Sequence, residues 1–183
     1  MERHAHYVKQ GFRNRTVICT ANGPLNLIVP VLHTTPLSQT PFGQIRIDPS
    51  HRWRTTMWRT VESAYRNAPF YEYYADDFRT ILFAGHDFLF DLNMALLHRA
   101  FSALGWDKIL EETLRYEEAP EAIDFRNQIN AKKSYTTRPF LAPKPYVQVF
   151  PGTFTPNSGV LDLVFCCGPE AGRIIDQSRS PEK

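Results

Sequence analysis

The sequence predicts an α+β fold in which an N-terminal β-hairpin and small sheet pack against a helical layer in a single domain. Two observations favour it. The first third holds β-branched runs on both sides of Asn22-Gly23, and residues 50–105 carry apolar side chains at helical spacing. The length of 183 residues fits one domain, which we expect over residues 1–176, followed by a polar tail over residues 177–183.

The first elements are predicted strands. Residues 16–19 and 25–31 flank Asn22-Gly23, a strong hairpin signal, here with a slightly longer loop than the shortest turns. The apolar run through residues 27–32 suits a strand buried on both faces, with Pro30 at a bulge or on an edge. Polar and apolar residues then alternate over 44–48, which predicts a third strand.

Three helices are expected next. Asp48 or Ser50 caps the first helix, which ends near Asn67 and buries a stripe at helical spacing formed by Trp53, Met57 and Val61. Residues 69–74 form a short second helix. The third helix begins after Asp87 and ends at Gly105. Its apolar residues cover most of its circumference, so it is expected to be largely buried.

The last part of the chain is less regular. Residues 117–145 are charged and contain repeated prolines, and they predict a long, partly mobile loop. The alternation over residues 146–150 predicts a short strand. Asn157 or Ser158 is the expected cap of a following helix, and Pro169 is the expected start of a last helical turn.

Composition excludes several classes of protein. The formal net charge is only +2 and the basic residues are spread along the chain, so no nucleic-acid partner is expected. No apolar stretch reaches the roughly 20 residues of a membrane span, and no secretory signal opens the chain. The three cysteines lack a Cys-x-x-Cys pair, which indicates reduced thiols and a cytoplasmic location.

Two groups of residues suggest a catalytic triad and a metal site, but their spacing fits neither. Asp91, His98 and Ser102 share one face of the third helix, but seven residues at about 1.5 Å each place Asp91 about 10 Å from His98, too far for a triad. No residue emerges as a catalytic base, and no cofactor is expected. A metal site is not expected either, because the spacing typical of zinc ligands is missing from the candidate set His4, His6, Cys19 and His33.

The stretch over residues 7–15 is the strongest candidate site. It concentrates basic and amide side chains around an aromatic residue, and Arg binds phosphate or carboxylate groups bidentately. The alternative is a solvated edge strand whose charges block pairing with other strands. We expect a site for a nucleotide-linked sugar or small anion, formed by Lys9, Gln10, Arg13, Asn14, Arg15, Tyr146 and Gln148.

Several motifs resemble the WbqC-like protein family. They are Tyr-Val-Lys-Gln-Gly-Phe-Arg-Asn-Arg at 7–15, Ala-Asn-Gly-Pro-Leu-Asn-Leu-Ile-Val-Pro-Val at 21–31 and Ala-Tyr-Arg-Asn-Ala-Pro-Phe at 64–70. Further similarity, in the same order, covers Trp53, Asp91-Leu92-Asn93, residues 146–150 and residues 156–163. Members usually begin with an additional stretch rich in Tyr, Phe and Pro, so the resemblance implies a shortened form or a misplaced start. Gly159 stands where members more often keep a larger residue.

The resemblance also implies a function. Members are bacterial and are often encoded near genes for surface polysaccharide (O-antigen), and some are suggested to decorate a sugar by aminoacyl or acyl transfer. The expected function is therefore a transferase acting on a nucleotide-linked sugar or an acyl donor, with the basic face holding donor phosphate. The alternative is a non-catalytic binding or scaffold protein of a polysaccharide assembly system, with a protein partner.

Overall fold

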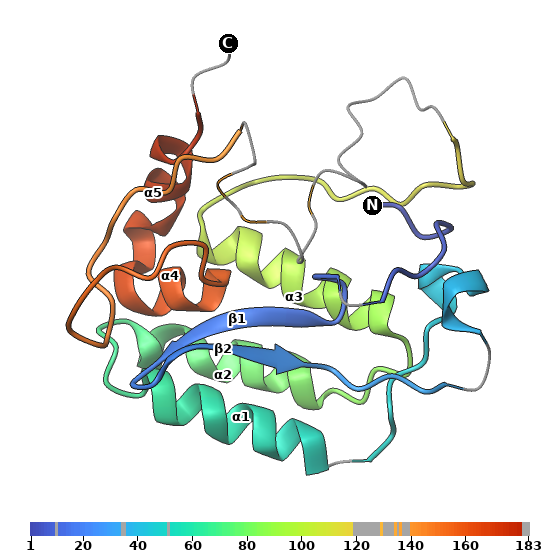
Figure 1. The fold of residues 1–183 in the computed structure, drawn as a ribbon, viewed down its shortest axis with the longest axis horizontal. Helices are drawn as coiled ribbons and strands as arrows, with labels where there is room; N and C mark the ends of the chain where they lie inside the picture. Colours follow the sequence, from blue (N-terminus) through green and yellow to red (C-terminus); the bar gives the residue numbers. More distant parts are fainter. Residues whose placement is uncertain are drawn as a thin grey trace.

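The computed structural model describes residues 1–9, 11–33, 36–50, 52–118, 129, 134, 136 and 140–180. Its regular elements, in chain order, are β1 (Arg15–Thr20), β2 (Gly23–Ile28), α1 (Arg52–Tyr65), α2 (Tyr71–Phe83), α3 (Leu89–Ala103), α4 (Val160–Cys167) and α5 (Ala171–Gln177). The hairpin lies across α1, α2 and α3, and α4 and α5 stand together at one end of it (Figure 1). The predicted α+β fold class is confirmed.

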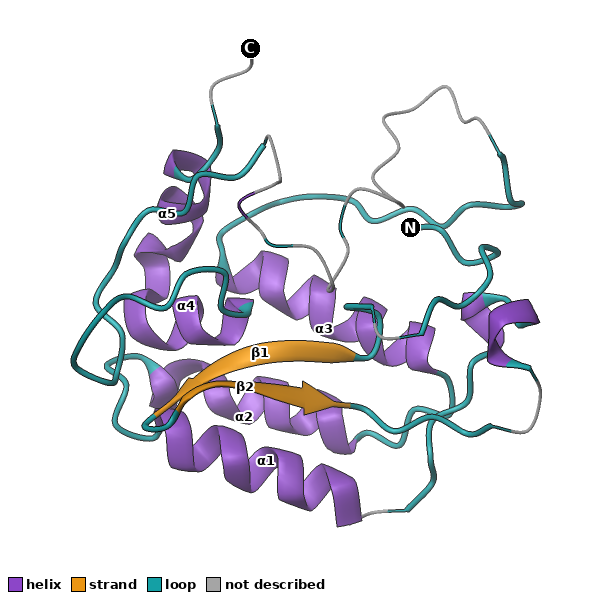
Figure 2. Cartoon of the chain, in the orientation of Figure 1, coloured by secondary structure: helices purple, strands orange, loops and turns teal. Residues whose placement is uncertain are grey.

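The hairpin is tighter than the sequence suggests. β1 and β2 are antiparallel, and Thr20 pairs with Gly23, so the turn between them contains only Ala21 and Asn22. Gly23 has a φ of +96°, a backbone conformation that glycine adopts without steric cost, and this explains the short connection. In the described residues the hairpin forms the sole sheet, with two strands (Figure 2).

Two predictions about strands are wrong. β2 ends at Ile28, which is 46% exposed whereas Leu27 is 7% exposed, so the apolar run is buried on one face and Pro30 lies beyond the strand. Residues 44–48 form no strand of the sheet. Ile45 and Ile47 are buried as their alternation indicates, but the segment makes only single bridges, from Ile47 to Val31 and from Arg46 to Phe88.

The helices follow the predicted order with two differences. α2 continues to Phe83, well past residue 74, because Ala75, Phe78 and Leu82 recur at helical spacing and are buried. The cap of α4 is Gly159 rather than Asn157 or Ser158. α1 and α3 lie close to their predicted ranges, but α1 begins at Arg52 and the residue before it lies outside the described residues, so the predicted cap at Asp48 or Ser50 is not confirmed. Gly105, with a φ of +68°, follows α3 as a left-handed residue.

The segment over residues 146–150 is not a strand in the structure. Val147 is 88% exposed, while Tyr146 and Gln148 on either side of it bond to Asp162. Tyr146 and Gln148 therefore face inward and Val147 faces outward. The inward-facing side chains are held by side-chain hydrogen bonds to Asp162, and the backbone does not pair with another strand among the described residues. Most of the expected loop over residues 117–145 lies outside the described residues.

The core has two parts. The larger lies between the hairpin and helices α1, α2 and α4, and Phe165 is at its centre, with ring contacts to Tyr65, Tyr71 and Phe78 at centroid distances of 5.4, 5.2 and 6.1 Å. The smaller part packs the segment over residues 37–47 against the start of α3. Both parts bury aromatic rings, which contribute more apolar area per residue than aliphatic side chains.

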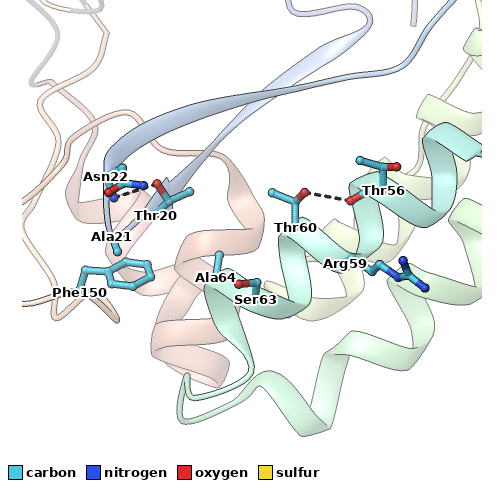
Figure 3. Close-up of a pocket in the computed structure, with 9 residues that line it drawn as sticks. All are labelled: Thr20, Ala21, Asn22, Thr56, Arg59, Thr60, Ser63, Ala64 and Phe150. Atoms are coloured by element: carbon cyan, nitrogen blue, oxygen red, sulfur yellow. Dashed lines mark hydrogen bonds between the residues drawn. The ribbon is translucent and has the colours of Figure 1, made fainter.

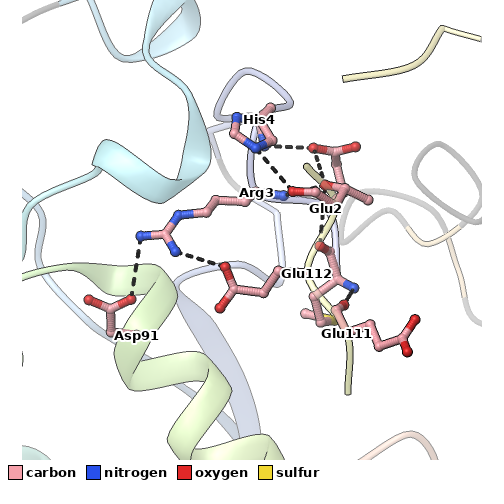
Figure 4. A network of polar contacts seen from close by, with 8 residues as sticks. Glu2, Arg3, His4, Asp91, Glu111 and Glu112 are labelled. Atoms are coloured by element: carbon pink, nitrogen blue, oxygen red, sulfur yellow. Dashed lines mark hydrogen bonds and ion pairs between the residues drawn. The ribbon is translucent and has the colours of Figure 1, made fainter. Parts of the chain in front are cut away.

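The first residues of the chain are held by the segment that follows α3. Arg3 Nη1 lies 2.7 Å from Glu112 Oε2, and Arg3 Nη2 lies 3.9 Å from Asp91 Oδ1 (Figure 4). The Thr113 amide donates to the Met1 carbonyl at 3.0 Å. These contacts fix the start of the segment that carries the basic residues, and they place Asp91 beside Arg3.

Candidate functional site

A cavity of about 380 Å³ lies between the hairpin and helices α1 to α4. Its walls are apolar and include Leu27, Trp58, Val61, Phe78, Leu96 and Leu161. Polar residues contribute to the lining from the segment before β1, from the start of β1 and from α3. They are Arg13, Asn14, Arg15, Thr16 and Asn93. Ligand pockets commonly hold about 300–1,000 Å³ and combine apolar walls with a few polar groups, so the cavity has the size and composition of a small-molecule site.

The polar part of this lining is tied down by backbone contacts. Arg13 Nη1 donates to the His6 carbonyl at 2.7 Å, and its guanidinium lies 5.3 Å from the centroid of Phe42. Burial lowers the pKa of Arg13, although the group stays charged at neutral pH. Asn93 Nδ2 donates to the Arg13 carbonyl at 2.6 Å, which joins α3 to the basic segment. The backbone of Arg13 is therefore held against α3, and its guanidinium is held by His6 and Phe42.

Two polar atoms of cavity-lining residues are buried without a partner among the described residues. They are Oδ1 of Asn14 and Nε of Arg15. Asn14 Nδ2 donates to the Val29 carbonyl at 3.1 Å, so only the oxygen of that amide is left over. Buried polar groups are nearly always hydrogen-bonded in proteins, so this pair needs an explanation.

The lining residues of the cavity include no Asp, Glu, His or Cys. These are the side chains that most often act as general bases or nucleophiles. The arrangement can bury an apolar group and hold a polar or anionic end by hydrogen bonds and charge. Among the described residues, its lining supplies no carboxylate, imidazole or thiol that could act as a base.

A second polar cluster surrounds Asp162, in the first turn of α4. Its side chain is 0% exposed and accepts hydrogen bonds from Tyr65 Oη at 2.9 Å, Tyr146 Oη at 2.5 Å and Gln148 Nε2 at 2.8 Å. No Lys or Arg forms an ion pair with Asp162 in the part of the chain that the structure describes. Burial, and then the Asp162 charge, raise the pKa of both tyrosines far above the usual value, so they remain hydrogen-bond donors.

Cys19 lies at the edge of the same cluster. Its Sγ is 3.1 Å from Ser158 Oγ and 3.3 Å from Gln148 Nε2, and its amide donates to Tyr65 Oη at 2.9 Å. Burial raises the pKa of the thiol, which disfavours the thiolate that a nucleophile requires. The cluster thus fastens β1, α1, α4 and the segment over residues 146–158 to one another and is structural in character.

The structure divides the predicted site residues between these two places. Arg13, Asn14 and Arg15 line the cavity, whereas Tyr146 and Gln148 belong to the Asp162 cluster. The Arg13 guanidinium bonds His6 and the Gln148 amide bonds Thr155 and Asp162, so these two groups do not converge. Lys9 is exposed, and Gln10 lies outside the described residues.

Sequence reasoning missed Asp162, although a signal for it exists. It is the single charged residue in the otherwise apolar run of α4, Val160–Cys167. A carboxylate in such a run must either face solvent or find hydrogen-bond donors, and here it finds three. The apolar residues of the cavity were expected as core, because an apolar stripe looks the same whether it meets another side chain or a ligand.

A surface hollow of about 490 Å³ lies between the hairpin turn and α1 (Figure 3). Asn22, Ser63 and Phe150 contribute to it, together with Thr56 and Thr60, whose hydroxyls donate to the carbonyls of Arg52 and Thr56 at 2.9 Å. It is open to solvent, and its lining residues lack the unpartnered buried atoms found on Asn14 and Arg15. Within the described ranges, no cluster of three metal-ligating side chains occurs, and no helix is long and apolar enough to cross a membrane.

The fold and the cavity define an α+β protein with an apolar ligand-sized cavity and a cationic, amide-bearing edge. The model of the WbqC-like protein family matches residues 2–140, about three quarters of the chain, and the protein belongs to this family. The matched range contains the basic segment and α3, while Asp162 follows it. No curated protein and no solved structure matches the chain.

Proposed function

We propose that this protein is a transferase of bacterial cell-surface polysaccharide biosynthesis and that it takes an acyl donor. The similarity to the WbqC-like family supports the link to surface polysaccharide. One observation carries the choice of donor: the lining of the cavity is mainly apolar and includes the cationic residues Arg13 and Arg15 at one part. A nucleotide-linked sugar carries polar groups along its whole length and would bury little of the apolar surface of these walls. An acyl chain is apolar and would bury that surface.

The roles of the residues follow from this placement. Leu27, Val61 and Leu96 would bury the acyl chain and exclude water from it. Arg13 and Arg15 would lie beside the polar end, where positive charge stabilises negative charge that develops on a carbonyl oxygen. Catalysis would come from positioning and electrostatics. We place the reaction in the cytoplasm, because all three cysteines are free thiols.

A thermal-shift comparison tests the proposal. Octanoyl-coenzyme A should raise the melting temperature of the protein by several degrees, and a nucleotide-linked sugar should raise it much less. The variant Ala100→Phe fills the cavity from α3 and should lose the shift, while the variant Lys9→Ala, at an exposed position, should keep it. A shift with the nucleotide-linked sugar alone would reject the acyl donor.

The second candidate is a non-catalytic binding protein of a polysaccharide assembly system. The observation in its favour is the missing acid or base in the cavity lining. On this alternative the acyl compound binds but is not transferred. Incubation with octanoyl-coenzyme A and a panel of sugars, followed by mass spectrometry, separates the two: an acylated sugar supports the transferase, and an unchanged panel together with a co-purifying protein supports the binding protein.

A further inference from the structure

The cavity has two different ends. At one end Arg13 and Asn93 contribute to the lining, and Asn93 Nδ2 donates to the Arg13 carbonyl at 2.6 Å. At the other end the lining is apolar and comes from Ala100 on α3 and from Val160 and Leu161 at the start of α4. α3 runs from the first end toward α4 (Figure 1). A bound acyl compound would therefore keep its polar group near Arg13 and extend its chain toward α4.

The end of the cavity near α4 is closed by the core. Ala100 is 4% exposed, and among the described residues it is the last residue of α3 that contributes to the lining. At the end of the same helix, Ala103 and Leu104 belong instead to the buried cluster that also contains Val164 and Phe165. Because protein interiors are close-packed, a chain that reaches Ala100 has no space beyond it. The side chain at position 100 therefore decides where a bound chain must end.

The length of the cavity follows from helix geometry. Asn93 and Ala100 are seven residues apart on α3, which corresponds to about 10 Å at about 1.5 Å per residue. An extended chain of single bonds advances about 1.2 Å per bond, as the extended polypeptide backbone does. The distance therefore accommodates about eight bonds. The walls along it include the apolar side chains of Val61, Phe78 and Leu96.

We propose that the protein selects acyl donors with a medium-length chain of about eight carbon atoms, and that Ala100 is the residue that sets this length. The inference rests on the proposed function and names the class of acyl donor for the same cavity. A shorter chain leaves part of the apolar lining in contact with water. A longer chain must displace the packed core around Phe165, which costs free energy.

Calorimetric titration of the wild-type protein tests the length. The ligands are butanoyl-, octanoyl- and hexadecanoyl-coenzyme A, each below the concentration at which it forms micelles. All three share the coenzyme A group, so differences in affinity report on the chain. Affinity should rise about four-fold for each methylene group between butanoyl and octanoyl, since each buries apolar surface, and should be lower again for hexadecanoyl. An affinity that is highest for hexadecanoyl or for butanoyl would overturn the inference.

A pair of variants on α3 tests the residue. Ala100→Leu places a larger side chain at the closed end, so the preferred chain should change from octanoyl to butanoyl. Ala95→Leu is the matched control, because it makes the same substitution on the same helix at a residue outside the lining, and it should keep the octanoyl preference. An octanoyl preference that survives in Ala100→Leu would overturn the role of Ala100.

The wild-type series needs no variant to fold, so the chain length stays testable by itself. If acyl-coenzyme A compounds bind without an optimum in chain length, only this inference fails. If none of them binds, the proposed function fails as well.

Discussion

The hydroxyl of Tyr65 donates a hydrogen bond to Oδ1 of Asp162 over 2.9 Å, and both side chains are 0% exposed. The same hydroxyl accepts the bond from the Cys19 amide, also at 2.9 Å. One oxygen atom therefore joins β1, α1 and α4. These elements form one side of the cavity, so the Asp162 cluster sets the shape of a site that it does not itself enter.

The substitution Tyr65→Phe should lower the free energy of unfolding by about 2–3 kcal/mol, because it leaves a buried carboxylate oxygen and a buried amide without partners. Tyr71→Phe is a matched control. Tyr71 also contacts the Phe165 ring, at a centroid distance of 5.2 Å, but its hydroxyl does not bond to Asp162. Denaturant melts should show a change below about 0.5 kcal/mol for the control. Equal losses in the two variants would contradict the role given to the hydroxyl.

Stability should fall steeply in alkali. The folded protein raises the pKa of Tyr65 and Tyr146 far above the unfolded value of about 10. Their contribution is therefore complete below about pH 10 and is lost as the pH rises beyond it, by about 1.4 kcal/mol per pH unit for each tyrosine. Tyrosinate absorbance should show that these two ionise only when the protein unfolds. Tyr146→Phe should make the alkaline loss of stability shallower, and an unchanged slope would argue against this cause.

The thiols should be unreactive while the protein is folded. Burial, with a contribution from the Asp162 charge, raises the pKa of Cys166 to about 12 and of Cys167 to about 11, and burial also raises that of Cys19. Because the thiolate is the reactive form, a chromogenic disulfide reagent at about pH 8 should react slowly with the native protein. All three thiols should react at once in denaturant. A rapid reaction of one thiol in the native protein would show that this thiol is more accessible to solvent than its burial indicates.

Gly159→Ala should be strongly destabilising. A Cβ atom at this position would lie 2.2 Å from Thr16 Oγ1 and 2.8 Å from the Val17 carbonyl oxygen, and the Gly159 amide donates to that carbonyl at 2.7 Å. We expect a loss of at least about 2 kcal/mol in denaturant melts, because the backbone itself must shift. Gly11→Ala is the control, since its Cβ would meet only the Val8 carbonyl oxygen at 3.5 Å. If the Gly159 variant were as stable as this control, β1 and the start of α4 would have to be less closely packed than these distances indicate.

The sequence predicted what depends on local chemistry and missed what depends on long-range contacts. The spacing of apolar residues located α1 and α3, and the hairpin followed from the β-branched runs around Asn22-Gly23. The sequence predicted Arg13 and Arg15 as site residues and they contribute to the cavity lining, but their separation from Gln148 depends on the path of the segment over residues 146–158.

The cluster around Asp162 illustrates the same limit. Tyr65 and Asp162 are 97 residues apart in the chain, and no local pattern indicates that they meet. The cavity could not be predicted either, since Leu96 and Leu161 have the spacing of ordinary core residues. Only the packing of the hairpin over the helices decides that they line an open space.

The most direct test of the account is the position of a bound acyl chain. Nuclear Overhauser effects should be measured between the terminal methyl group of octanoyl-coenzyme A and the methyl groups of the protein. The account predicts contacts to Leu96 and Leu161 inside the cavity, and their loss in Ala100→Phe. Contacts confined to the exposed side chain of Ile28 would contradict it, because Ile28 lies on the face of the hairpin opposite the cavity-lining Leu27.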